Sequence, residues 1–350
     1  MAKKANSMHL LVIRLSAMGD VAMTVPILLA LHKAYPKQKI TVLTKPHLTP
    51  LFAGIPNLEV LGAKVTSDHK GIVGLWRLSR QIRQLEVTHI ADFHNVLRSK
   101  ILTAFLKMNG LPVARIDKGR AEKKALVRAE KKNFKQLKTT HERYREVLLQ
   151  LGFELPARES HVLHRPLLEG KLRSLLGSKD EKVVGIAPFA TYPGKMYELK
   201  RMEEVIQGLV ALGNIQVLLF GGGKHEVALL DSCAAKYGDA VLNIAGKYSL
   251  EEELKLIAHL DVMVAMDSGN GHLAANYGVP VLTIWGVTHP FAGFAPYGQP
   301  TSNALLPNRE KYPLIPTSVY GNKYPESYKD AINSIPSSLV LDKVKQVLKN

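Results

Sequence analysis

Short apolar runs rich in β-branched residues alternate with longer segments of helical periodicity along almost the whole chain. Because a crossover through a helix lays the next strand parallel to the last, this alternation predicts right-handed βαβ units and parallel sheets. In the first half, the strand-like runs are 8–14, 39–44, 58–61 and 87–93, and the helical patterns are 21–35, 71–85, 96–109 and 137–151. In the second half, the strand-like runs are 182–187, 215–220, 240–244, 261–266 and 280–285, and the helical patterns are 199–213, 224–237, 249–260 and 270–278.

An irregular segment divides the chain near its middle. Leu155 to Asp180 holds two prolines and two glycines among mixed charges, and 350 residues fit two domains of ordinary size. The expected fold is therefore α/β, with two facing Rossmann-like domains, because open parallel sheets bind ligands beyond the carboxyl ends of their strands. The predicted division is a tail at 1–7, an N-terminal Rossmann-like domain at 8–160, a linker at 161–181, a C-terminal Rossmann-like domain at 182–335 and a closing helix at 336–350 that packs back toward the first domain.

Cysteine content and hydropathy limit where such a chain works. Cys233 is the single cysteine, so an internal disulfide is excluded and a reducing cytoplasm is favoured. No stretch reaches the ~18 consecutive apolar residues of a transmembrane helix. The apolar run from Met8 ends at Arg14, which is too short for the core of a signal peptide.

The net charge of +17 indicates an anionic partner. From Lys118 to Arg145, which we call the basic tract, the sequence has eleven Lys or Arg and three Glu. Nucleic acid, an anionic membrane face and a phosphorylated substrate all fit such a tract. A solubilising surface helix is the simpler alternative.

The first polar motif, Arg14-Leu15-Ser16-Ala17-Met18-Gly19-Asp20, directly follows the first predicted strand. Asp20 falls at the start of a helix, where aspartate commonly caps the free N–H groups. At the mouth of a ligand site, the same carboxylate could accept a proton from a sugar hydroxyl. The motif leaves both roles open.

The second motif, Met266-Asp267-Ser268-Gly269-Asn270-Gly271-His272-Leu273, follows another predicted strand and opens a helix. Its small residues let backbone N–H groups approach a ligand, as in sites that hold pyrophosphate. A plain strand–helix turn capped by Asp267, with His272 as a core histidine, is the alternative.

Two further loops follow strands in the second half. Pro188 to Tyr197 carries Thr191 and Lys195, a hydroxyl and an ammonium that suit a diphosphate. Gly221-Gly222-Gly223-Lys224-His225-Glu226 fits neither the dinucleotide fingerprint nor the Walker P-loop, and it indicates a glycine-rich turn near a nucleotide. The histidines show no metal-ligand spacing, so no metal is expected.

Taken together, these motifs resemble the bacterial lipopolysaccharide heptosyltransferases, glycosyltransferase family 9, which have the two-Rossmann-domain GT-B fold. Arg14-x-Ser16-x-x-Gly19-Asp20 resembles their opening motif. Asp267-Ser268-Gly269-x-x-His272-Leu273 resembles their second signature, which Gly278-Val279-Pro280-Val281 and Gly286-x-Thr288-x-Pro290 continue in register. Lys195-x-Tyr197 resembles their Lys-x-Trp-Pro segment.

The resemblance implies an inverting, metal-independent transfer of heptose from ADP-heptose to a lipopolysaccharide inner-core or lipid A type acceptor, without a cofactor. It implies a cytoplasmic enzyme, peripheral on the anionic inner face of the inner membrane, with no nucleic-acid partner. Asp20 is then the expected general base. The expected donor-binding residues are Thr191, Lys195, Glu226, Asp267, Ser268, Gly269 and His272. The expected acceptor-binding residues are Arg14, Ser16, Lys123, Lys124 and Arg128.

Three departures from the family pattern affect the donor side. Tyr197-Glu198 stands where the family has Trp-Pro, and His289 where it has Asp. A cysteine-rich stretch near the C-terminus is missing. A different nucleotide-sugar donor on the same fold is therefore one alternative, and a basic α/β protein that binds nucleic acid is another.

Overall fold

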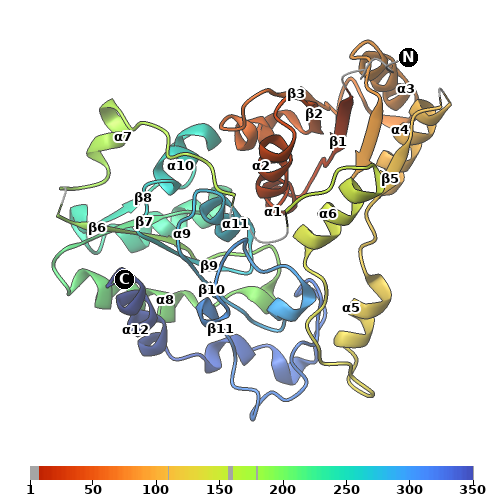
Figure 1. The fold of residues 1–350 in the computed structure, drawn as a ribbon. Helices are drawn as coiled ribbons and strands as arrows, with labels where there is room; N and C mark the ends of the chain where they lie inside the picture. The colour runs from red at the N-terminus through yellow and green to blue at the C-terminus, as the bar shows by residue number, and fades with distance from the viewer. Residues whose placement is uncertain (1–7, 109, 157–160, 179, 350) are drawn as a thin grey trace. The chain divides into compact units, whose positions relative to one another are not determined.

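Two parallel β-sheets, one in each half of the chain, organise the computed structural model, which describes residues 8–108, 110–156, 161–178 and 180–349 (Figure 1). The described residues fall into two compact units. The first unit comprises the described residues within Met1–Lys118 and Thr140–Leu163, and the second those within Gly119–Thr139 and His164–Asn350. The predicted α/β fold with a parallel sheet in each half is confirmed.

Most of the basic tract lies in a different unit from the one that the sequence predicts. Gly119–Thr139 belongs to the second unit by its contacts, whereas the predicted first domain runs without interruption from 8 to 160. Lys132 shows why, because its Nζ donates to the carbonyl oxygens of Leu314 at 2.8 Å and Pro316 at 2.6 Å. These partners lie almost two hundred positions away in the sequence, where no local pattern could indicate them.

The sheet of the first unit has the strand order β3-β2-β1-β4-β5. Every residue of β1 is buried, as expected for a central strand of a parallel sheet covered on both faces. The strand order reverses direction between β1 and β4, where Ile13 pairs with Asp92. The strands are β1 (His9–Ile13), β2 (Lys39–Thr44), β3 (Leu58–Gly62), β4 (His89–Asp92) and β5 (Val113–Arg115). The helices of this unit are α1 (Met18–Ala22), α2 (Val25–Ala34), α3 (Gly71–Arg83), α4 (Leu97–Lys107) and α6 (Thr140–Gln150).

The sheet of the second unit has the strand order β11-β10-β9-β6-β7-β8. Here the order reverses between β6 and β9, where Ala187 pairs with Ala265. The strands are β6 (Lys182–Ala187), β7 (Ile215–Leu219), β8 (Val241–Asn243), β9 (Val262–Met266), β10 (Val281–Ile284) and β11 (Ala304–Leu305). The helices are α5 (Arg120–Leu126), α7 (Gly170–Ser174), α8 (Leu199–Val210), α9 (Lys224–Ala234), α10 (Leu250–Ile257), α11 (Gly269–Ala275) and α12 (Ser337–Leu348).

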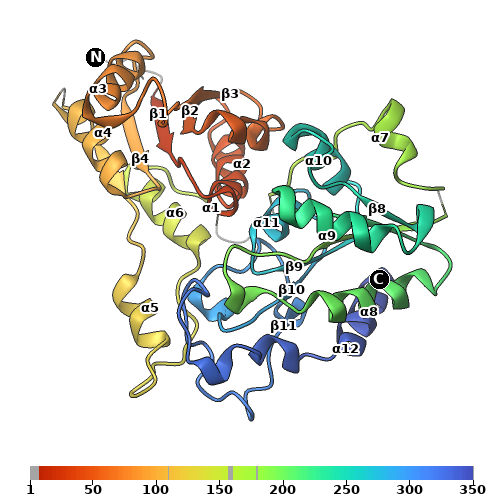
Figure 2. The same cartoon turned by 180° about the vertical axis from the view of Figure 1, so that it is seen from behind.

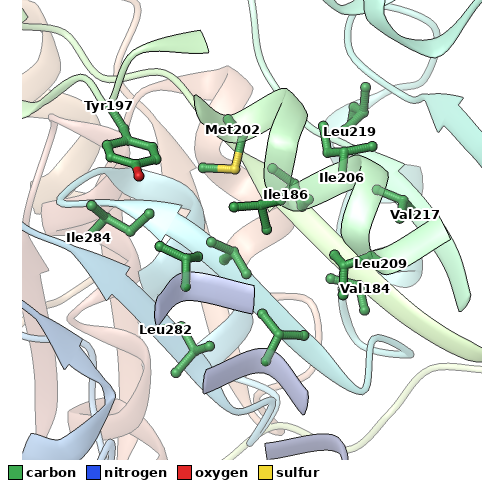
Figure 3. Close-up of a cluster of buried hydrophobic side chains, with 14 of the residues drawn as sticks. Val184, Ile186, Tyr197, Met202, Ile206, Leu209, Val217, Leu219, Leu282 and Ile284 are labelled. Atoms are coloured by element: carbon green, nitrogen blue, oxygen red, sulfur yellow. The ribbon is translucent and has the colours of Figure 1, made fainter. Parts of the chain in front are cut away.

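The core of the second unit forms where α8 covers the sheet, as Figure 3 shows. Met202, Ile206 and Leu209 recur on one face of α8 and pack against strand residues such as Ile186 and Leu219. Fully burying one such side chain contributes roughly 1.5–3 kcal/mol to folding. The spacing of these apolar residues is what places the helix on the sheet.

The closing helix α12 packs on α8 within the same unit (Figure 2). Val340 and Val344 are fully buried in the core cluster of the second sheet. The sequence predicts instead that this helix packs back toward the first domain. In the structure its apolar face packs on α8 and β9 of the second unit, and its position relative to the first domain stays a prediction.

Candidate functional site

An ion pair between Arg14 and Asp20 stands at the reversal point of the first sheet. Arg14 directly follows β1, and Asp20 lies in α1, the short helix that comes next. Arg14 Nη2 is 2.5 Å from Asp20 Oδ2, and the Ala17 N–H donates to the same oxygen at 3.3 Å. The Asp20 side chain is 32% exposed. Among the described residues nothing hydrogen-bonds to its other oxygen, Oδ1, which is therefore open to an incoming hydroxyl.

Buried groups hold this pair from behind. Arg14 Nη1 donates to the Phe93 carbonyl at 2.8 Å, and the Tyr144 hydroxyl donates to the Asp20 carbonyl at 3.1 Å. The Tyr144 ring stacks on Phe93 with centroids 4.3 Å apart. Burial works against the charge on Arg14, but the neighbouring Tyr144, Asp20 and Asp92 raise its pKa, so the guanidinium stays charged. The Asp20 side chain is thus held at a fixed position.

The loop after β4 brings a second polar group to the same edge, one that the motifs do not reveal. Asp92 is fully buried and accepts hydrogen bonds from the backbone N–H groups of His94 at 3.0 Å and Asn95 at 2.8 Å. The Ser99 hydroxyl donates to its other oxygen at 3.0 Å. Asp92 therefore shapes the turn that carries His94. The sequence signal that could have identified His94 as a site residue is its position directly after a predicted strand.

His94 is a neutral imidazole close to the ion pair. Burial, together with the positive charges of Arg14 and Lys118, lowers its pKa to about 3, against an opposing effect of Asp20. Its Nδ1 is buried and has no hydrogen-bond partner among the described residues. Ser16 is half-buried in the loop between Arg14 and Asp20.

The corresponding cluster in the second unit links the loops after β6, β9 and β10. Lys195 Nζ lies 2.7 Å from Asp267 Oδ2 and 3.1 Å from the Asp267 carbonyl oxygen. The Thr288 hydroxyl donates to Asp267 Oδ2 at 2.9 Å. The two charged side chains are 14% and 6% exposed, respectively, so the pair is largely shielded from water. In the sequence, Thr288 is named only as part of a family motif and is given no role of its own. The structure shows that it belongs to this cluster.

Glycines let the backbone close around Lys195. The Val287 N–H donates to the Gly194 carbonyl at 2.9 Å, and this approach excludes a side chain at Gly286, whose Cβ would collide with Gly194 O. Gly321 has φ +83°, and a Cβ there would lie 2.6 Å from Lys195 Cγ. The segment around Gly321 thus covers the stem of the lysine and fixes its direction.

The donor loop after β9 has the predicted position at the start of α11. Ser268 is the N-cap residue, and its Oγ is buried with no hydrogen-bond partner in the described part of the chain. Gly271 faces Val281 and Pro296, which leaves little room for a side chain there. His272 is 7% exposed. Gly269 begins the helix, so the N–H groups of its first turn point to the carboxyl edge of the sheet.

Two further expected donor residues, Thr191 and Glu226, lie at the same edge and make no hydrogen bond or ion pair with Lys195 or Asp267 in the described part of the chain. Thr191 is exposed in the loop after β6. Glu226, in the first turn of α9, accepts from the Gly222 N–H at 2.8 Å and so shapes the turn after β7. The structure therefore brings Lys195, Asp267 and Thr288 into contact, while Thr191 lies in the same loop as Lys195 and Glu226 in α9, outside this contact.

Tyr197, one of the departures from the family pattern, packs in the core of the second unit. Tyr197 is 3% exposed, and Figure 3 shows its ring in the core beside Met202. Its hydroxyl donates to the Ile335 carbonyl at 2.7 Å. His289, a second departure, is buried, and its pKa falls to about 4 because of burial and the nearby Arg309 and Lys132.

The cations of the basic tract have two different environments. Lys123 is 6% exposed, with Nζ 3.9 Å from the centre of the Phe294 ring. Burial, with Arg309 nearby, lowers the pKa of Lys132 to about 8. Lys124 and Arg128 are exposed. A pocket of about 500 Å³ is lined by Arg120, Lys123, Lys124, Tyr320, Asn322 and Lys323, among others, so this part of the second unit offers several cations to one ligand.

Two absences concern the described residues alone. They contain no group of three or more His, Cys, Asp or Glu side chains placed to hold a metal ion. Nor does any helix among them combine the length and the apolar character that crossing a bilayer requires.

The comparisons with known proteins agree on one family. The model of glycosyltransferase family 9 (heptosyltransferase) matches residues 75–321. The lipopolysaccharide core heptosyltransferase OpsX of Haemophilus influenzae is 23% identical over 82% of this chain and 81% of its own length. A family 9 glycosyl transferase from Veillonella parvula superposes with a TM-score of 0.75 at 20% identity, over 100% of this chain and 99% of the other. The Escherichia coli heptosyltransferase WaaC with ADP gives 0.68 at 18%, over 97% and 100%. At these identities the two structures show that the fold is shared, the GT-B fold.

Proposed function

The chain belongs to glycosyltransferase family 9 (heptosyltransferase), and from this premise we propose that it transfers a heptose from ADP-heptose to a lipopolysaccharide inner-core or lipid A type acceptor, with inversion and without a metal ion. The ADP bound to WaaC supports the adenine nucleotide, and the heptosyltransferase activity of relatives such as OpsX supports the sugar. The observation that carries the proposal is the position of Asp20, anchored through Oδ2 with Oδ1 open at the reversal point of the first sheet.

Asp20 is the proposed general base. The acceptor hydroxyl oxygen attacks the anomeric carbon while its proton passes to the Asp20 carboxylate. The bond from the anomeric carbon to the β-phosphate oxygen breaks, and its electron pair leaves with ADP. A single displacement from the opposite face inverts the anomeric centre. Arg14 keeps Asp20 in position, and Ser16 and Arg14 are the proposed acceptor contacts in this loop.

The second unit is proposed to bind the donor. Lys195 is positioned by Asp267, which Thr288 holds in turn. The ammonium and the N–H groups that begin α11 at Gly269 face the charge that develops on the leaving diphosphate, where preorganised donors contribute most. Thr191 and Ser268 supply hydroxyls, and His272 and Glu226 complete the proposed donor contacts.

The acceptor carries phosphates and carboxylates on this proposal, and the basic tract is its proposed partner. Lys124 and Arg128 are exposed and available to such groups. Lys123 lies against Phe294, so its contribution is proposed to come through the pocket that it lines with Lys124 and Lys323. The enzyme is proposed to work in the cytoplasm, at the inner face of the membrane that holds the acceptor.

Binding and product analysis test the function together. Calorimetry with ADP, UDP and GDP, beside a mixed oligonucleotide, should show ADP as the tightest ligand and no oligonucleotide binding. Mixing ADP-heptose with a delipidated inner-core acceptor should release ADP and add one heptose, with inversion seen by NMR at the anomeric carbon. Preference for another nucleotide would indicate a different donor on this fold, and oligonucleotide binding without sugar transfer would refute the proposal.

A further inference from the structure

Four large apolar side chains are exposed at the beginnings of α3 and α4 in the first unit. Ile72 is 65% exposed, Val73 68%, Trp76 47% and Leu97 75%. Figure 1 shows the two helices side by side, and they pack against each other. Ile72 and Leu97 line one hollow of about 380 Å³ between the two helix starts. We call the surface formed by these four side chains the α3–α4 surface.

The same two helices carry only positive charge. Their sequences contain six Lys or Arg and no Asp or Glu. All six are exposed: Arg77, Arg80, Arg83, Arg98, Lys100 and Lys107. The Arg80 guanidinium lies 5.2 Å from the centre of the Trp76 ring. An exposed aromatic and aliphatic patch within a field of cations is the composition of segments that lie in the headgroup layer of a membrane.

We propose that the α3–α4 surface docks on an anionic phospholipid bilayer. The apolar side chains enter the boundary between headgroups and acyl chains, and the six cations contact the lipid phosphates, with their stems lying along the apolar layer. A second copy of this chain fits less well, because pairing the surface with itself would bring like charges together. Most of the basic tract, for which the sequence leaves a membrane face as one of three possible partners, lies in the other unit.

The position of the surface gives the docking a consequence for the site. α4 begins shortly after His94, at the carboxyl end of β4, which is also the edge of the first sheet that carries Arg14 and Asp20. A glycolipid headgroup that rises from the docked bilayer is therefore presented on the edge where Asp20 lies. The inference goes beyond the proposed transfer and does not require it, since docking involves neither donor nor acceptor.

Trp76 makes the docking measurable in the intact protein. The chain has two tryptophans, and the other, Trp285, is 1% exposed. The protein should sediment with vesicles of phosphatidylglycerol and phosphatidylethanolamine, and its tryptophan emission should shift to shorter wavelength. Brominated lipid should quench it. Pure phosphatidylcholine vesicles should do neither. Trp76→Phe should keep the binding and lose the emission shift, which assigns the signal to the surface.

Matched variants test whether vesicle binding depends on the α3–α4 surface or on any exposed apolar side chain. Ile72→Ser with Leu97→Ser should weaken vesicle binding by at least about tenfold, because two apolar side chains no longer enter the lipid. Arg98→Gln with Lys100→Gln should weaken it by about tenfold or more on anionic vesicles. Leu149→Ser, at a side chain 58% exposed on α6 of the same unit, is the control and should bind as the parent does. Circular dichroism and the melting temperature show whether each variant is folded.

Three outcomes would overturn the proposal. They are no binding of the folded protein to anionic vesicles, a loss of binding in the Leu149→Ser control as large as in the surface variants, and unchanged binding of the surface variants. Self-association without lipid that Ile72→Ser and Leu97→Ser abolish would assign the surface to a second copy. Because the vesicles contain no acceptor and no nucleotide sugar is added, failure here leaves the transfer function standing, and failure of transfer leaves the docking standing.

Discussion

The ammonium of Lys195 contacts Asp267 twice. Its Nζ lies 2.7 Å from the Asp267 carboxylate and 3.1 Å from the Asp267 backbone carbonyl oxygen. The loop after β6 is thereby fastened to the loop after β9, at the place where the strand order of the second sheet reverses. Such reversal points are where open α/β sheets bind their ligands. A largely shielded lysine that already has a fixed direction loses little freedom when a diphosphate arrives.

Lys195→Ala should weaken the binding of ADP more than that of adenosine, because only ADP presents phosphates to the ammonium. A loss of about 1.5–3 kcal/mol for ADP is the expected size of a hydrogen bond to a charged group. Calorimetry with both ligands measures the difference. Lys200→Ala, at an exposed lysine of α8, is the matched control. Equal losses for ADP and adenosine would mean that Lys195 acts structurally.

Asp20→Asn should lower kcat by about 10²–10⁴, because it removes the base and keeps the size of the side chain. Donor affinity should stay nearly unchanged, since Asp20 belongs to the first unit and the proposed donor contacts belong to the second. Asparagine can still accept from the Ala17 N–H, so the start of α1 should remain formed. Steady-state kinetics with ADP calorimetry decide the matter. A variant that keeps most of its turnover would leave Asp20 as a helix cap.

The strand–helix alternation was enough to predict most elements, and at β2 and β6 even their bounds. Both are runs of β-branched and apolar residues that end at a polar or small residue, so the local sequence carries the whole signal. β5, α7 and β11 are too short to show periodicity, and the structure alone reveals them. The family motifs similarly predict Lys195 and Asp267 as site residues, but their contact depends on the pairing of β6 with β9.

Residues whose role arises from distant contacts could not be predicted in this way. His94 becomes notable because β4 pairs with β1 and brings it beside Arg14. Lys123 resembles its exposed neighbour Lys124 in sequence, yet it packs on Phe294, far along the chain. The tertiary environment decides that His94 is neutral and that Lys123 is buried, and no local pattern encodes that environment.

Acid should destabilise the protein partly through His94. Its pKa is about 3 in the folded chain against an ordinary value of 6.5. Between these two pH values the unfolded chain therefore binds a proton that the folded chain does not bind. Stability is therefore fully present above about pH 6.5 and lost as the pH falls toward 3, by up to about 1.4 kcal/mol per pH unit. Denaturation by urea at several pH values should show a shallower acid slope for His94→Asn than for the parent. His225→Asn, at an exposed position of α9, is the control. An unchanged slope in His94→Asn would assign the acid loss to other groups.

The exposed part of the basic tract should act on the acceptor. Lys124→Gln with Arg128→Gln should raise the acceptor KM on a soluble, delipidated fragment and flatten its dependence on salt, because ions screen exposed charges over about 10 Å at 0.1 M. ADP affinity should not change. Lys200→Gln with Lys349→Gln removes equal charge elsewhere as a control. If the double variant matches the parent on the soluble fragment, the tract serves solubility or membrane attraction. Lys123 is left out because its removal would disturb the contact with Phe294.

Gly321→Ala should test whether the stem of Lys195 must lie where the structure has it. The new Cβ would stand 2.6 Å from Lys195 Cγ, so the lysine has to move away from its place beside Asp267. The same substitution also forces alanine to φ +83°, which costs roughly 1–2 kcal/mol of stability by itself. Gly213→Ala isolates that cost, because Gly213 has φ +78° and no atom within 4 Å of the added Cβ. Both variants should melt earlier, Gly321→Ala by at least as much as Gly213→Ala, and Gly321→Ala alone should bind ADP several-fold more weakly. Equal ADP affinity in the two variants would mean that the lysine does not need this support, and the proposed role of the Gly321 segment would be wrong.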